Sequence, residues 1–200
     1  TPNAGVAACV IAQMCVMAGS YAYLLMTFYK EKLHKYFIFG CLLFFAVIPF
    51  NAVYAVTLWK DVLLGAVVLL FSLSIWKIIR KSEAGKGAGD YVLFGITGVL
   101  LCILRSNGYY AYLLCIPFFI LFFKRKRKII IPICITTVML TVFYKGPVLE
   151  YYEVEPPDRI ESLSIPAQHI ARVIVDGGEL TREQYELLEK AVDVSQIKEV

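Results

Sequence analysis

Residues 109–144 read YYAYLLCIPFFILFF (109–123), KRKRK (124–128) and IIIPICITTVMLTVFY (129–144), two apolar blocks joined by five consecutive cations. Neither apolar block contains a charged side chain. A bilayer core about 30 Å thick favours such blocks, and only helices can satisfy every backbone group there in segments of this length. The stretch therefore predicts two membrane helices with the cations at the turn between them.

The rest of the chain has a similar composition. Hydrophobic residues make up 59% of the 200 positions, charged residues make up 18%, and the mean hydropathy is +0.68. A water-soluble domain cannot bury so much apolar surface. We therefore expect an all-α, polytopic transmembrane bundle with the lipid bilayer as its solvent. The net charge of +4 does not indicate a nucleic-acid partner, because the cations lie between apolar blocks.

Reading the apolar blocks between charges predicts about six spans. They cover residues 5–29, 36–54, 62–79, 91–104, 109–123 and 129–144, so the bundle occupies 1–144. The fourth and fifth blocks are short, and a re-entrant hairpin is the alternative for them. Because the chain opens directly on an apolar block without Met or a signal-peptide pattern, we expect a fragment whose amino-terminal part is missing.

Positive charge predicts the orientation of these spans. Cytoplasmic loops hold an excess of Lys and Arg. Alternate connections hold 12 of the 20 basic residues: Lys30, Lys32, Lys35, Lys77, Arg80, Lys81, Lys86 and the run Lys124 to Lys128. These connections should face the cytoplasm. The run at 124–128 is read as a topology anchor that touches anionic headgroups, in preference to a specific phosphate-binding patch. The expected topology is that of a multi-pass membrane protein with an extracytoplasmic tail.

Residues 145–200 form that tail. They contain 12 acidic residues against six basic ones, so they should lie in water. Ser164 can cap a helix that stops at Gly177-Gly178, and Thr181 with Gln184 forms a capping box for a second helix. We expect an amphipathic helical segment that rests on the outer membrane surface.

The apolar blocks contain further features with a structural interpretation. All six cysteines lie inside them without a CxxC pair, which favours packing residues over a disulfide framework or a zinc site. Gln13 is expected to be an interhelical hydrogen-bond partner. A seam of small residues should allow close helix packing. The seam consists of Ala8, Ala12, Cys15, Gly19 and Ala22.

Candidate chemistry lies at the outer ends of the spans. None of the six blocks contains an ionisable Asp, Glu, Lys, Arg or His at the depth of the bilayer midplane, whereas ion-coupled transporters place such groups there. Polar residues gather instead in three clusters that the topology brings to one level. They are residues 57–61, 105–108 and 164–172. If the chain has a functional site, it should lie at this water-lipid boundary.

Several members of these clusters also have a structural interpretation. Trp59 fits an interfacial aromatic belt, and Asp61 beside Lys60 fits a charge pair at a helix end. Arg105 ends a short span, so it needs an anionic partner or must reach the headgroups. Asn107 precedes Gly108 as in an ordinary turn.

Three tail residues share one face of the first predicted tail helix. Gln168 and Arg172 are four residues apart, and His169 and Arg172 are three apart. This face either points at the membrane rim or is a solvated polar face. In the first case, it would close a groove around Asp61 and Arg105.

Together these residues resemble a family of uncharacterised bacterial multi-spanning membrane proteins, itself similar to the GT-C-fold glycosyltransferases that use polyprenyl-phosphate sugars. The resemblance covers nearly all 200 residues. It rests on Arg105 with Ser106-Asn107-Gly108, on Trp59-Lys60-Asp61 after Pro49-Phe50, and on Ser164-Ile165-Pro166 leading to Gln168 and Ala171-Arg172. The family pattern has Asn at Ser106 and often Gln at His169, which weakens His169 as a general base.

The resemblance implies a location in the bacterial cytoplasmic membrane and an enzyme that takes a sugar from a polyprenyl-phosphate carrier at the outer face of that membrane. It implies catalytic roles for Asp61, as a secondary acid or orienting group, and for His169. It implies substrate or phosphate binding by Trp59, Lys60, Arg105, Asn107, Gln168 and Arg172. It also implies a principal carboxylate upstream of the present residues. No metal ligands are identified, and a need for a divalent metal is left open.

Two other functions remain open at this stage. A translocase of lipid-linked sugars or polymers would use the same face but needs a polar tunnel. A non-catalytic envelope assembly protein would use Asp61 and Arg105 only as rim charges. The sequence identifies neither the sugar, the acceptor nor the oligomeric state.

Overall fold

The computed structural model describes residues 2–80, 87–154, 168–169, 172–173, 175–176, 178 and 181. The chain divides into two compact units, Thr1–Tyr152 and Glu153–Val200. Every element assigned within the described residues is helical, so the all-α prediction is confirmed.

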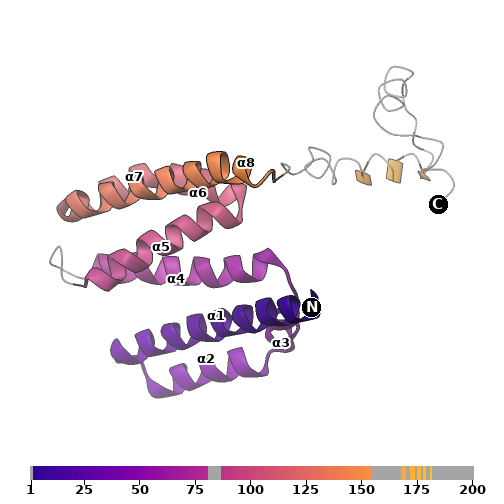
Figure 1. Cartoon of the computed structure of the whole chain (residues 1–200). Coiled ribbons are helices and arrows are strands. Elements are labelled where there is room, and N and C mark those ends of the chain that lie inside the picture. Colours follow the sequence, from indigo (N-terminus) through magenta and orange to yellow (C-terminus); the bar gives the residue numbers. More distant parts are fainter. Residues whose placement is uncertain are drawn as a thin grey trace. The chain divides into compact units, whose positions relative to one another are not determined.

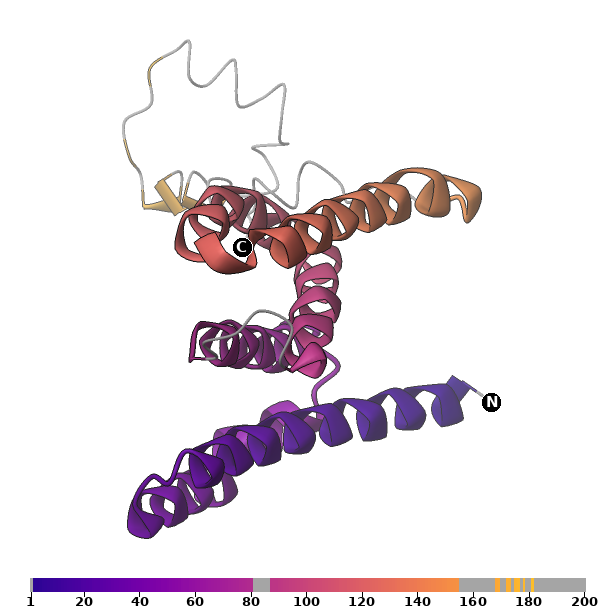
Figure 2. The same ribbon diagram turned by 90° about the vertical axis from the view of Figure 1, so that its left-hand side faces the viewer.

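The first unit is a bundle of helices (Figure 1). Helix α5 contacts α4, α6 and α7, and lies between α4 and α7 in both Figure 1 and Figure 2. Helix α1 packs against α4 and also contacts α2 and α3. The elements are α1 (Pro2–Lys30), α2 (Lys35–Val47), α3 (Pro49–Val56), α4 (Lys60–Arg80), α5 (Ala88–Leu104), α6 (Ser106–Phe122), η1 (Lys124–Lys126), α7 (Arg127–Phe143), η2 (Tyr144–Val148) and α8 (Leu149–Tyr151).

Three helical stretches among the described residues are long and apolar enough to cross a membrane. They are Ala4–Lys30, Lys60–Arg80 and Lys124–Tyr151. The bent pair α2 and α3 adds a fourth if it forms one span. Helices α5 and α6 are apolar but have 17 residues each, which lies at the lower limit for a span across about 30 Å. They are longer than the blocks expected at 91–104 and 109–123.

The expected single helix at 36–54 is wrong, because the chain breaks between α2 and α3. The two helices are bent by 53°. Pro49 has no N–H to donate to the carbonyl of Phe45, four residues earlier, and Ile48 takes an extended conformation at ψ 117°. Asn51 compensates for the lost donor, since its side-chain Nδ2 donates to the Phe45 carbonyl at 2.9 Å.

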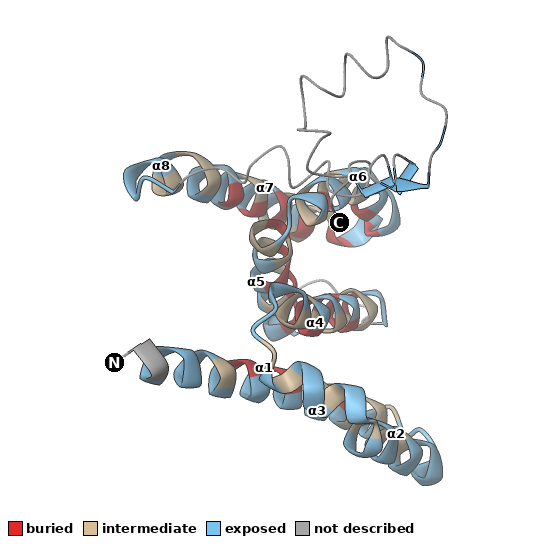
Figure 3. Ribbon diagram, turned by 90° about the vertical axis from the view of Figure 1, so that its right-hand side faces the viewer, coloured by how far each residue is buried: buried red, intermediate tan, exposed pale blue. Residues whose placement is uncertain are grey.

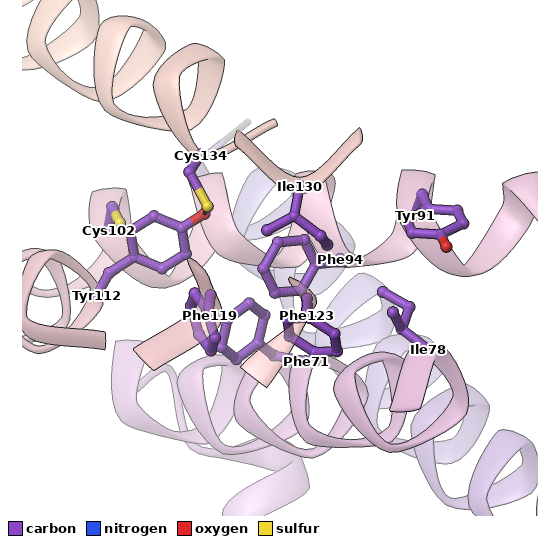
Figure 4. Close-up of a cluster of buried hydrophobic side chains, with 10 residues drawn as sticks. All are labelled: Phe71, Ile78, Tyr91, Phe94, Cys102, Tyr112, Phe119, Phe123, Ile130 and Cys134. Carbon is purple, nitrogen blue, oxygen red and sulfur yellow. Dashed lines mark hydrogen bonds between the residues drawn. The ribbon is translucent and has the colours of Figure 1, made fainter. Parts of the chain in front are cut away.

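The core of the first unit is aromatic and joins α4, α5, α6 and α7 (Figure 4). Phe71 stacks on Phe94 with ring centroids 5.1 Å apart, and Phe119 meets Phe94 edge-on at 5.4 Å. Tyr112 is buried beside them, and its hydroxyl lies 3.6 Å from the sulfur of Cys134. Offset and edge-on ring contacts of this kind add specific geometry to ordinary packing.

The exterior of the first unit is largely apolar. Helices α2 and α3, all of whose residues are described, contain no buried residue and appear pale blue and tan in Figure 3. Large apolar side chains such as Phe39, Phe44 and Val47 are exposed there. The seam of small residues on α1 is also exposed, with nothing within 4 Å of a Cβ added at Gly19, so its role in packing stays a prediction. An apolar exterior of this extent is unusual for a water-soluble monomer.

The helix ends separate the charges along the bundle. The α1–α2 turn, the end of α4 and η1 lie at one end, on the left in Figure 1. The α3–α4 connection, the α5–α6 turn and η2 lie at the opposite end. At the first end, Arg80 Nη2 of α4 lies 2.8 Å from Oε2 of Glu31 in the α1–α2 turn, and Lys77 Nζ of α4 lies 3.9 Å from the ring centroid of Tyr23 in α1.

The expected boundary of the tail at residue 145 is too early. Helical backbone continues through η2 and α8 to Tyr151, and the second unit begins at Glu153. Pro147 lies in this continuation, within a π-helical turn. Proline has no N–H to donate to the carbonyl four residues earlier, and the wider π-helical turn does not use that hydrogen bond.

A few residues of the tail are described. Gln168, His169, Arg172, Val173 and Val175 have helical backbone, and the Gly178 N–H bonds the Val173 carbonyl at 2.8 Å. This agrees with a first tail helix that ends at the glycine pair. The second predicted tail helix, from position 182, lies outside the described residues.

Candidate functional site

Asp61 and Arg105 form an ion pair between the start of α4 and the α5–α6 turn. Arg105 Nη2 donates to Asp61 Oδ2 at 3.3 Å, and Arg105 Nε lies 3.2 Å from Asp61 Oδ1. Each side chain is 46% exposed, so the pair remains accessible to a ligand. The predicted proximity of these two residues is confirmed, while their roles stay predictions.

The α5–α6 turn holds Arg105 in place. Arg105 is the single residue between the two helices, in an extended conformation at φ −142° and ψ 136°. Gly108 follows within the first turn of α6, where an added Cβ would collide with the carbonyl oxygen of Leu101 in α5. Gly108 therefore permits a close approach of the two backbones, which the turn interpretation of Asn107-Gly108 did not predict. Asn107 itself is exposed in the same helical turn.

A cavity of about 430 Å³ lies beside this ion pair, between α1, α3 and α4. Its lining combines aromatic rings, an amide and a carboxylate: Met17, Tyr21, Asn51, Tyr54, Trp59, Asp61, Val62, Gly65 and Ala66. Trp59 is 60% exposed, so much of its surface is accessible to a ligand. Asp61 belongs both to the cavity and to the ion pair, and therefore links the two.

Hydrogen bonds from α1 fix the wall of this cavity. Gln13 Nε2 donates to the carbonyls of Tyr54 at 3.0 Å and Thr57 at 2.8 Å, which lie at the carboxyl end of α3. The Tyr21 hydroxyl donates to Asn51 Oδ1 at 3.2 Å. Gln13 is therefore an interhelical hydrogen-bond partner, as predicted, and these bonds attach the broken helix pair to α1.

Sequence reasoning missed Tyr21, Asn51 and Tyr54 as cavity residues. The signal that could have identified Asn51 is its position two residues after Pro49, because a proline inside an apolar block leaves a carbonyl that needs a new donor. No comparable signal marks Tyr21, which meets Asn51 only through packing of α1 on α3.

Two lysines accompany the site at the same end of the bundle. Lys60 is the first residue of α4 and is exposed beside Asp61. Lys145 lies in η2, and its Nζ is 5.2 Å from the ring centroid of Tyr109. Tyr109 follows Arg105 by one helical turn. Lys145 was not among the predicted site residues.

The predicted tail residues belong to the second unit. Gln168, His169 and Arg172 are exposed, and Arg172 Nε lies 3.6 Å from Asp176 Oδ2, four residues later. Pairing with Asp176 is typical of a solvated helix face. The closing of the groove by these residues stays a prediction.

The described residues contain no group of three or more His, Cys, Asp or Glu side chains that could hold a metal ion. All six cysteines are free thiols. Cys102 and Cys134 are buried in the aromatic core, where they act as small packing residues.

Comparison with known proteins gives one family and no assigned activity. A family profile with the description "Family of unknown function (DUF6020)" matches residues 1–200. Neither a curated protein nor a solved structure matches the chain. The function must therefore be argued from the chemistry of the residues themselves.

Proposed function

The chain belongs to this family of unknown function, DUF6020, and we propose that it is a membrane-embedded glycosyltransferase of the GT-C type. It takes a sugar from a polyprenyl-phosphate donor and transfers it to an envelope acceptor at the outer face of the bacterial cytoplasmic membrane. The observation that carries the proposal is the position of Asp61, which lines a cavity of about 430 Å³ and binds Arg105 at its edge. A site for a small polar ring therefore adjoins a group that binds phosphate.

The cavity has the chemistry that a sugar requires. Its volume lies within the range of about 300–1,000 Å³ that is usual for small-ligand sites. The C–H faces of a sugar ring pack on aromatic surfaces such as Trp59 and Tyr54, while its hydroxyls bond amide and carboxylate groups. Asn51 and Asp61 supply these groups.

Arg105 supplies the phosphate-binding group. A guanidinium carries five N–H donors, and Asp61 engages only those on Nε and Nη2. The remaining donors are available to a phosphate oxygen, in the geometry that makes arginine a preferred phosphate ligand. Because Asp61 holds the guanidinium through both carboxylate oxygens, we assign Asp61 the orienting role.

In the proposed reaction, the acceptor hydroxyl attacks the anomeric carbon of the sugar. The bond from that carbon to the phosphate oxygen breaks, and polyprenyl phosphate leaves with the bonding electrons. Arg105 stabilises the charge on the leaving phosphate. A further carboxylate takes the proton of the hydroxyl, and the resemblance places that group upstream of the present residues.

The orientation that we expect for the bundle in a bilayer supports the proposed position of the donor. We place the basic helix ends at the cytoplasmic face and the Asp61–Arg105 pair at the opposite headgroup level, where a lipid-linked donor presents its phosphate. The exposed apolar side chains of the bundle then face hydrocarbon. In this arrangement the tail lies outside the cell.

The test is sugar transfer by the full-length protein in proteoliposomes, with a labelled polyprenyl-phosphate sugar and an acceptor membrane fraction. We expect Arg105→Ala to lower the rate by roughly 100-fold or more, because removal of one transition-state donor commonly has such an effect. Arg80→Ala is the matched control, since Arg80 also ends a helix and pairs with a carboxylate, but at the opposite end. Transfer at the wild-type rate by Arg105→Ala would refute the role of Arg105, and an absence of transfer by the wild-type protein would support the assembly-protein alternative.

The break between α2 and α3 favours a second candidate, a translocase for lipid-linked sugars. Transporters commonly place discontinuous helices at their substrate sites, and Asn51 at this break lines the cavity. Proteoliposomes without acceptor distinguish the two functions. A translocase moves the donor between leaflets under these conditions, whereas a glycosyltransferase leaves it in its original leaflet.

A further inference from the structure

A second cavity lies at the basic end of the bundle, away from Asp61 and Arg105. Its volume is about 670 Å³, and it lies where the end of α4 meets the α6–η1 turn. The lining consists of four apolar residues followed by three cations: Ile79, Leu121, Phe122, Phe123, Lys124, Arg125 and Lys126. The cavity is therefore apolar along one side and strongly basic along the other.

The run of five cations has two structural members. Lys126 is buried, and its Nζ donates to the carbonyl of Ile78 near the end of α4. Arg127 Nε donates to the carbonyl of Ile120 at 2.7 Å. These two residues tie the turn to α4 and α6, so the geometry of the cavity is fixed by the protein.

Lys124 and Arg125 have a different environment. Both are exposed and line the cavity. Within the part of the chain that the structure describes, no carboxylate pairs with either of them. Among the described residues, these two neighbouring cations on the turn therefore have no anionic partner.

The apolar side of the cavity is open as well. Phe122 is 79% exposed, and Leu121 and Ile79 are more than half exposed. A small soluble anion would leave these side chains uncovered. An amphiphile with an anionic head and a hydrocarbon chain matches both sides of the cavity, since charge meets Lys124 and Arg125 while the chain covers Phe122 and Leu121.

From this match we propose that the cavity binds one anionic phospholipid. The lipid phosphate lies between Lys124 and Arg125, and the first part of an acyl chain covers Leu121, Phe122 and Ile79. This site is independent of the proposed sugar transfer, because it uses different residues at the opposite end of the bundle. It divides the basic run into a structural part, Lys126 and Arg127, and a lipid-binding part, Lys124 and Arg125.

The test compares phosphatidylglycerol with phosphatidylcholine of the same acyl chains, bound to the full chain in detergent and measured by native mass spectrometry. Two cations near an anionic headgroup predict a preference for phosphatidylglycerol of about 30-fold. The double variant Lys124→Ala/Arg125→Ala should abolish this preference. The matched control Lys128→Ala/Lys35→Ala removes the same charge outside the cavity and should change it by less than about two-fold.

Two further measurements keep the proposal falsifiable. Phe122→Ser should weaken the binding of both lipids, and unchanged binding would overturn the placement of the acyl chain. Glycerol phosphate should not compete at the concentrations at which phosphatidylglycerol binds, and equal competition would make the ligand a soluble phosphate. Equal affinity of the wild-type protein for the two lipids, or an equal loss in the control variant, would also overturn the proposal.

Discussion

Substitution of Gln13 by Leu removes the two best hydrogen bonds that hold α3 to α1. The Gln13 side chain is 8% exposed, and its Nε2 reaches the carbonyls of Tyr54 at 3.0 Å and Thr57 at 2.8 Å. Leucine has a similar size but no donor, so both carbonyls at the end of α3 lose their side-chain partner. The wall of the Asp61 cavity should therefore loosen.

The expected loss of stability follows from the two bonds. Interhelical hydrogen bonds in membrane proteins contribute about 0.6 kcal/mol on average and up to about 1.7 kcal/mol. Two bonds of good length give roughly 1–3 kcal/mol. A third contact, 3.4 Å from Gln13 Nε2 to the Ala55 carbonyl, is too long to add much.

Reversible unfolding in mixed micelles of a non-ionic detergent and dodecyl sulfate measures this loss. A Trp76→Phe background leaves Trp59, next to the end of α3, as the one tryptophan of the 200 residues. Its fluorescence then reports on the region that Gln13 holds. Met14→Leu, at an exposed position on α1, is the neighbouring control. If Gln13→Leu unfolds at the same detergent ratio as the control, the hydrogen bonds do not hold α3 and the argument fails.

The same titration tests two further substitutions. Gly108→Ala should lower the free energy of unfolding by about 1–3 kcal/mol, because the new Cβ must displace a backbone carbonyl of α5. In the control Gly40→Ala, the new Cβ meets nothing within 4 Å, so the substitution should be neutral or stabilising. Equal losses in the two variants would refute the close approach of α5 and α6 at Gly108. Lys126→Met should lower the free energy of unfolding by about 1–3 kcal/mol, because the buried carbonyl of Ile78 loses its donor. In the control, Lys128→Met at an exposed position should change it by less than about 0.5 kcal/mol. A similar loss in both variants would contradict the structural role of Lys126.

The sequence predicts the helical class because apolar blocks of this length between charges can satisfy their backbone groups in lipid only as helices. It does not by itself predict the break at Pro49. The block at 36–54 is uniformly apolar, so a rule based on hydropathy reads through the proline, whereas the missing N–H and the nearby Asn51 identify the break. The end of the bundle was missed for the opposite reason. Lys145 and Glu150 signal water, yet the backbone stays helical to Tyr151.

The candidate site divides in a similar way. Asp61 and Arg105 could be predicted as neighbours because each sits at the end of an apolar block, and alternate ends of a helical bundle meet at one level. The cavity beside them could not, since Tyr21 and Asn51 come together only through the packing of α1 on α3. The run at 124–128 looks uniform in sequence, and only its contacts distinguish the buried Lys126 from the exposed Lys124.

The proposed donor site is tested most directly by photo-crosslinking of the full-length protein. The probe is a polyprenyl-phosphate sugar with a diazirine on the sugar, and the labelled peptides are identified by mass spectrometry. Labelling should fall on the cavity residues, which are Met17, Tyr21 and those between Asn51 and Ala66, and unlabelled donor should suppress it. Labelling confined to helices other than α1, α3 and α4, or labelling of the cavity residues that excess donor does not suppress, would contradict a sugar site beside Asp61 and Arg105.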